Sequence, residues 1–130
     1  IVSRSGKPLR RKDVASEGPV ILDETAQLED GVTIRGPSYV GPAVVLRKGS
    51  VVDNACLYEG ARLEANAIVE KSIILEGSAI GSGAQIVDSV VSRDCVIGNG
   101  ARIVSSIIGE GMTLRAGSRL ENATVSQPPR

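Results

Sequence analysis

The chain lacks the residue types from which most catalytic and metal sites are built. Its 130 residues include no histidine, no tryptophan and no phenylalanine, and only two tyrosines and two cysteines. Histidine is the side chain whose ordinary pKa suits general acid–base catalysis near neutral pH, and Glu, Asp or Lys would need large pKa shifts to replace it. Without histidine the usual zinc ligands are missing as well. We therefore expect no metal site and no conventional acid–base pair.

A net charge and a long apolar run are also absent. Fifteen Lys and Arg residues balance fifteen Asp and Glu residues, so the formal net charge at pH 7 is zero. A neutral chain offers no strong electrostatic surface to nucleic acid. No apolar stretch is long enough to cross a bilayer, and no secretory signal is recognisable. We expect a cytoplasmic protein that binds neither nucleic acid nor a membrane.

What the chain does contain is an aliphatic residue at intervals of six, six and five positions. An α-helix repeats every 3.6 residues and a flat strand every two, whereas one inward aliphatic residue per hexapeptide is typical of a parallel β-helix. A β-sandwich would instead show period-two alternation and irregularly spaced turns. Three rungs make a coil of 17 residues, or 18 near the N-terminus. The register predicts one vertical column of inward residues: Val52, Val69, Ile86, Ile103 and Leu120.

Small residues and glycines mark the corners of this coil. Two edges carry residues that tolerate positive φ, namely Gly49, Asn66, Gly83, Gly100 and Gly117 on one, and Gly60, Gly77, Asp94 and Gly111 on the other. The five-residue rungs lack such a position, so we expect their corner to be shorter and sharper and to need no glycine. Cys56 and Cys95 fall on different faces more than two coils apart, and we interpret both as small core residues.

The repeats extend over residues 20–124 and make about six coils, which we assign to one domain. Residues 1–19 show no sustained periodicity and start with Ile rather than Met. We interpret them as a linker from a missing N-terminal domain, and residues 125–130 as a short tail. The scarcity of aromatic residues agrees with a narrow prism, which has little room for rings.

The register also places charged residues above one another on the surface. Glu59, Glu76, Arg93 and Glu110 should stack, and Lys71 should lie next to Asp88. We interpret these contacts as exposed ion pairs rather than as acid–base pairs. Arg102 and Arg119 should also stack, as a small cationic strip. This strip could face an anionic ligand or a neighbouring subunit, although solvated surface is the simpler interpretation.

Three rungs carry a first resemblance, to the hexapeptide-repeat family. They are IGSGAQ from Ile80, IGNGAR from Ile97 and IGEGMT from Ile108. The resemblance implies an all-β, left-handed parallel β-helix. The left hand is implied by the family alone, because the general preference for right-handed crossovers would predict the opposite. Many activities share these coils, so the motif indicates a fold rather than a reaction.

A second resemblance concerns TIRGPSYVGPAVVLRKGSVV from Thr33, together with IVDSVV from Ile86 and IVSSII from Ile103. These segments resemble the C-terminal β-helix of sugar-1-phosphate nucleotidylyltransferases. Similar coils end subunits of a translation-initiation nucleotide exchange factor and of ADP-glucose synthases, so the branch stays open. The resemblance implies Mg²⁺-dependent nucleotidyl transfer in the missing N-terminal domain. For this chain it implies assembly, as a homotrimer or homodimer, and regulation without a bound cofactor.

The alternative is a hexapeptide-repeat acyltransferase that uses acetyl-CoA. The commonest members take a proton with a histidine between subunits, and this chain has none. A site without histidine would lie between subunits and could use Tyr39, Asn54, Tyr58 and Lys71. Asn and Tyr can orient an acceptor, and Lys can hold a CoA phosphate. Arg102 and Arg119 are the further candidates for binding a cofactor.

Overall fold

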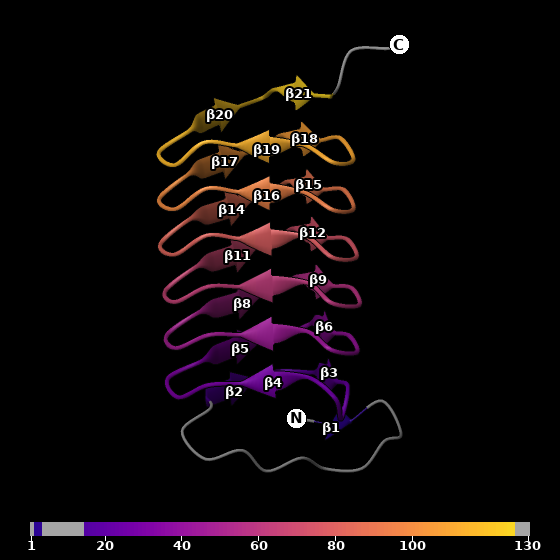
Figure 1. Cartoon of the computed structure of the whole chain (residues 1–130). Helices are drawn as coiled ribbons and strands as arrows, with labels where there is room; N and C mark the ends of the chain where they lie inside the picture. Colours follow the sequence, from indigo (N-terminus) through magenta and orange to yellow (C-terminus); the bar gives the residue numbers. More distant parts are fainter. Residues whose placement is uncertain (1, 4–14, 127–130) are drawn as a thin grey trace.

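Short parallel strands stack into three sheets in the computed structural model, which describes residues 2–3 and 15–126 (Figure 1). Sheet A contains β1 (Val2–Ser3), β3 (Val20–Leu22), β6 (Ser38–Val40), β9 (Cys56–Leu57), β12 (Ile73–Ile74), β15 (Val90–Val91), β18 (Ile107–Ile108) and β21 (Thr124–Val125). Sheet B contains β2 (Ala15–Glu17), β5 (Thr33–Arg35), β8 (Val51–Asp53), β11 (Ile68–Glu70), β14 (Gln85–Val87), β17 (Arg102–Val104) and β20 (Arg119–Glu121). Sheet C contains β4 (Gln27–Leu28), β7 (Val45–Leu46), β10 (Arg62–Leu63), β13 (Ala79–Ile80), β16 (Val96–Ile97) and β19 (Thr113–Leu114).

The strand register confirms the parallel β-helix and its period of 17 residues. In sheet B, Val69 is paired with Val52 below it and Ile86 above it, and Ile103 continues the column to Leu120. These inward side chains have no exposed surface until the last coil, where Leu120 is partly buried against the core. The left hand of the coil stays a prediction from the family resemblance.

Serine hydroxyls hold the corner that leads into sheet A. The backbone N–H of Ser89 donates to Ser72 Oγ, and that of Ser106 donates to Ser89 Oγ, each at 3.0 Å. Each hydroxyl in turn donates to a carbonyl two residues earlier, so that Ser72 reaches Glu70 at 2.7 Å. A buried N–H without a partner would be costly, and the hydroxyl of the coil below supplies one. This explains why serine recurs where alanine would fit by size.

Two of the three predicted corner rules are correct, and the third is correct only in its absence of glycine. Both glycine-marked edges have positive φ, as at Asn66 (62°) and Asp94 (56°). The corner of the five-residue rungs also uses a left-handed residue at every coil: Asn54, Lys71, Asp88, Ser105 and Asn122, with φ between 49° and 52°. In these coils, each of the three corners therefore contains a left-handed residue, including the corner of the shorter, five-residue rung. As predicted, this corner uses no glycine in these five coils.

Lys71 is a poor residue for this conformation, because its Cβ crowds the backbone at positive φ. We predict that Lys71→Asn raises the free energy of unfolding by about 0.5–1 kcal/mol, since Asn tolerates this region better. Urea unfolding followed by circular dichroism measures the change. Lys71→Ala is the control, because it removes the charge and keeps the Cβ. An equal gain from Ala would show that the charge, and not φ, is responsible.

The two cysteines differ from each other. Cys95 is fully buried, as predicted, and its Sγ donates to the Gly109 carbonyl at 3.1 Å. The interpretation of Cys56 as a core residue is wrong. It is half-buried in β9 on the outer side of sheet A, because the inward position of that strand belongs to Leu57. Both thiols are free.

The strand pairing extends on both sides of the predicted 20–124 range. β2 pairs with β5, and β21 pairs with β18. Most of the predicted linker, residues 4–14, and most of the predicted tail, residues 127–130, lie outside the described part of the chain. Within the described part, no helix is long and apolar enough to cross a membrane.

Candidate functional site

The clearest candidate site is a shallow groove at the corner between sheets B and A. Asn54 and Lys71 occupy the same left-handed corner position on consecutive coils, which brings them together. The groove has a volume of about 280 Å³, and its lining residues are Pro37, Asn54, Ala55, Cys56, Lys71, Ser72 and Ile73. It therefore combines an amide, an ammonium group and a half-buried thiol on an open surface.

Tyr39 and Tyr58, the other two predicted site residues, form a pair next to this groove. Their ring centroids are 5.9 Å apart and their planes are inclined by 60°, an edge-to-face geometry. Tyr39 is the register partner of Cys56, so the tyrosines and the groove lie on neighbouring parts of sheet A. Within residues 15–126, no hydrogen bond or ion pair links any two of the four predicted residues. Their proposed role in acyl transfer stays a prediction.

Arg102 and Arg119 stack as predicted, in β17 and β20. Both are exposed and line an open hollow of about 440 Å³ together with Val104, Leu120 and Glu121. Neither guanidinium forms an ion pair within the described residues. The hollow could receive an anion, but both side chains are surrounded by solvent, and binding there stays a prediction.

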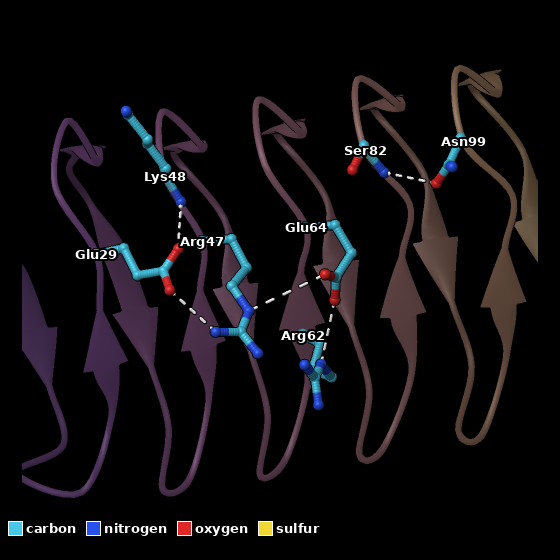
Figure 2. A network of polar contacts seen from close by, with 7 residues as sticks. All are labelled: Glu29, Arg47, Lys48, Arg62, Glu64, Ser82 and Asn99. Atoms are coloured by element: carbon cyan, nitrogen blue, oxygen red, sulfur yellow. Dashed lines mark hydrogen bonds and ion pairs between the residues drawn. The ribbon is translucent and has the colours of Figure 1, made fainter.

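A chain of ion pairs on sheet C was missed by the sequence analysis (Figure 2). Arg47 lies 2.9 Å from Glu29 on the coil below and 4.0 Å from Glu64 on the coil above, and Glu64 also pairs with Arg62 at 3.1 Å. The guanidinium of Arg47, followed by the backbone N–H of Lys48, holds the pKa of Glu29 below its ordinary 4.5. The sequence contains a signal for these ion pairs. The residues that follow the inward Leu28, Leu46 and Leu63 alternate in charge, as Glu29, Arg47 and Glu64.

The predicted surface ladders form only in part. Arg93 lies 4.0 Å from Glu110. Asp88 accepts a hydrogen bond from the Ser105 hydroxyl at 3.3 Å, and within residues 15–126 it forms no ion pair with Lys71. Exposed pairs of this kind contribute little to stability. No group of three or more Asp, Glu or Cys residues in the described ranges could hold a metal ion.

The fold and these surfaces define a hexapeptide-repeat β-helix domain whose described residues include no assembled acid–base site. The chain belongs to the family described as the GMPPB C-terminal domain, which matches residues 16–91. A curated relative, the UTP–glucose-1-phosphate uridylyltransferase of Synechocystis sp., is 42% identical over 55 residues. That match covers 42% of this chain and 14% of the relative, so the chain spans a small part of that enzyme. These matches confirm the predicted resemblance.

Two solved structures with the same fold are acyltransferases. The UDP-N-acetylglucosamine acyltransferase LpxA from Bacteroides fragilis superposes with a TM-score of 0.70 at 12% identity, over 81% of this chain and 55% of that one. GDP-perosamine N-acetyl transferase from Caulobacter crescentus, solved with CoA and GDP-perosamine, gives a TM-score of 0.56 at 19% identity, over 92% and 49%. At these identities the likeness shows the fold alone.

Proposed function

We propose that this chain is the C-terminal assembly and regulatory domain of a sugar-1-phosphate nucleotidylyltransferase. The observation that carries the proposal is the family match over residues 16–91, supported by the uridylyltransferase relative. In this proposal, an N-terminal domain outside the given sequence condenses a nucleoside triphosphate with a sugar 1-phosphate. We also propose that this enzyme is cytoplasmic, where both substrates are found.

The Mg²⁺ that such a reaction uses would belong to that N-terminal domain. The described residues here offer no group of carboxylates able to hold it. What this chain supplies is a stiff prism whose aliphatic axis is fully buried from Ile34 to Ile108. A stack in which each coil contacts only its neighbours is suited to hold attached domains at fixed positions in a homo-oligomer.

An acetyl-CoA-dependent acyltransferase is the second candidate. Its support is the groove that joins Asn54 and Lys71, on a fold shared with acyltransferases solved with coenzyme A. It ranks second because the chain has no histidine and because the four predicted residues form no hydrogen-bonded pair with one another in the described structure.

The test uses the complete product of the gene that encodes this chain, with a sugar 1-phosphate, the four nucleoside triphosphates and Mg²⁺. We expect pyrophosphate release by the complete protein and none by residues 1–130 alone. The control is the same assay with the unphosphorylated sugar, which has no phosphate to attack the nucleotide. A complete protein that releases no pyrophosphate with any common sugar 1-phosphate would contradict the proposal.

A further inference from the structure

The outer side of sheet A carries an unbroken column of uncharged side chains. In strand register, one residue from each of seven successive strands points outward, and the order is Ile21, Tyr39, Cys56, Ile73, Val90, Ile107 and Thr124. Ile21, Ile73 and Ile107 keep 50%, 38% and 51% of their surface exposed. Isolated exposed aliphatic residues are normal on a protein surface, but a continuous uncharged column that contains several of them indicates an interaction site.

A second outward column, one position after the inward residue, continues the uncharged surface. Backbone hydrogen bonds between coils align Asp23, Gly41, Tyr58, Leu75, Ser92 and Gly109. Asp23 is the one ionisable carboxyl among them. It is 8% exposed, and its carboxylate accepts hydrogen bonds from the Thr25 N–H and hydroxyl. Neither column therefore presents an exposed charge.

The outward columns of the other two sheets contain charged residues among uncharged ones. Sheet B presents Arg35, Asp53, Glu70, Arg102, Arg119 and Glu121, and sheet C presents Glu29, Arg47, Arg62, Glu64 and Arg115. Lys, Arg, Asp and Glu make up 23% of the sequence, so their exclusion from the outer face of sheet A is not a consequence of composition. Loss of charge with retention of Tyr and aliphatic residues is the pattern found in the buried centre of protein interfaces.

The size of this face suits a small, reversible interface between two copies. Strands about 4.8 Å apart give the seven strands of the uncharged column a length of about 29 Å, and two outward columns with their side chains are about 15 Å wide. The face therefore measures about 435 Å² per copy, and two copies would bury about 870 Å² in total. This is the size of a weak complex, whose formation depends on protein concentration.

We propose that sheet A is the face through which two copies of this chain pair, with the uncharged surface of one against that of the other. The inference rests on the assembly role proposed above. It specifies the partner, a second copy of this chain, and the number of copies in the assembly, two. A closed trimer needs two different surfaces on each copy, whereas a two-fold dimer uses the same surface twice. Among the described residues, one face is uncharged, and it complements itself because it carries no charges to repel its own copy.

The substitution that tests this pairing is Ile73→Asp, in the middle of the face. Its side chain points outward, so the monomer should fold normally, with an unchanged circular dichroism spectrum. In a dimer it would bury two carboxylates without partners. We expect the unmodified chain to have twice its 13.5 kDa mass by sedimentation equilibrium, and the variant to dissociate at least about 100-fold more readily. The matched control is Val96→Asp, at an aliphatic residue 49% exposed on sheet C, which should leave the dimer intact.

The native thiol of Cys56 supplies a second readout. Cys56 lies in the centre of the face and is half-buried in the single chain, whereas Cys95 is fully buried. Alkylation of Cys56 by a maleimide should therefore slow as protein concentration rises through the dimer dissociation constant, and this dependence should disappear in Ile73→Asp. Mass spectrometry of the digested protein identifies which thiol has reacted.

Three outcomes would overturn the pairing: a monomer at millimolar concentration, a trimer that Ile73→Asp leaves intact, or a dimer that Val96→Asp dissociates and Ile73→Asp does not. In the complete gene product, Cys56 protection that does not change with concentration in a monomer would show that another domain covers the face, which also contradicts the pairing. Pyrophosphate release is measured separately, so an unmodified complete protein that does not pair but retains nucleotidyl transfer would reject this inference and leave the proposed function standing.

Discussion

Replacing Ile86 with alanine will lower the free energy of unfolding by about 3–5 kcal/mol, the range for deleting a large buried aliphatic side chain whose neighbours cannot close the cavity. Ile86 has no exposed surface and lies in the column between Val69 and Ile103. The coils above and below are fixed by backbone hydrogen bonds across β14, so the cavity cannot collapse easily. Guanidinium unfolding monitored by circular dichroism measures the loss.

The control for Ile86→Ala is Gln85→Ala in the same strand. Gln85 points outward and is exposed, so its replacement should change stability by no more than about 0.5 kcal/mol. A similar loss from both substitutions would mean that the period-17 register does not separate inward from outward residues. Leu120→Ala should fall between them, because the last coil leaves Leu120 partly exposed.

Replacing Gly81 with alanine will also destabilise the coil strongly, by about 3 kcal/mol or more, which is at the upper end for overpacking because the obstacle is backbone. A Cβ at Gly81 would lie 2.6 Å from the backbone nitrogen of Asn99 and 2.7 Å from the carbonyl carbon of Gly98. Two adjacent coils would have to separate at that point. The Gly81 N–H donates to the Ile97 carbonyl at 2.8 Å, so separation would weaken that bond too.

Gly83, two residues later in the same IGSG motif, provides the matched comparison. Its φ is 69°, and a Cβ there would meet nothing within 4 Å. Gly83→Ala should therefore cost only the left-handed conformation, about 1 kcal/mol. Thermal unfolding of both variants distinguishes the two roles of glycine in this motif, which are close approach between coils at Gly81 and positive φ at Gly83. A larger loss at Gly83 than at Gly81 would contradict the close packing between coils.

The inward column was predictable because each rung has one inward aliphatic residue. The spacing between these residues is the same whether the residue is Val, Ile or Leu. The Val69 column could therefore be placed from spacing alone. Two of the corners were predictable for the same reason, since glycine or its substitutes recur there. The third corner was missed, because Lys71 and Ser105 adopt positive φ although their residue types disfavour it. The signal there is carried only by Asn54, Asp88 and Asn122, whose residue types tolerate positive φ.

The surfaces were harder to predict than the core. Asn54 and Lys71 meet in one groove because they are one coil apart, which the period implies. Cys56 was assigned to the core from its residue type, although its place before Leu57 in the period makes it outward. The uncharged face of sheet A was missed because the pattern analysis followed charged residues along the stack. An absence of charge shows as a surface feature only when whole columns are compared.

We propose that this β-helix assembles and positions other domains and does not catalyse acyl transfer. Calorimetric titration of acetyl-CoA into residues 1–130 tests it most directly, at a protein concentration high enough for subunits to associate, because an acyl-transfer site would lie between them. We expect no saturable heat and no acetylation of an amino-sugar phosphate added as acceptor. Saturable binding accompanied by acetylation that Lys71→Ala or Asn54→Ala abolishes would contradict it.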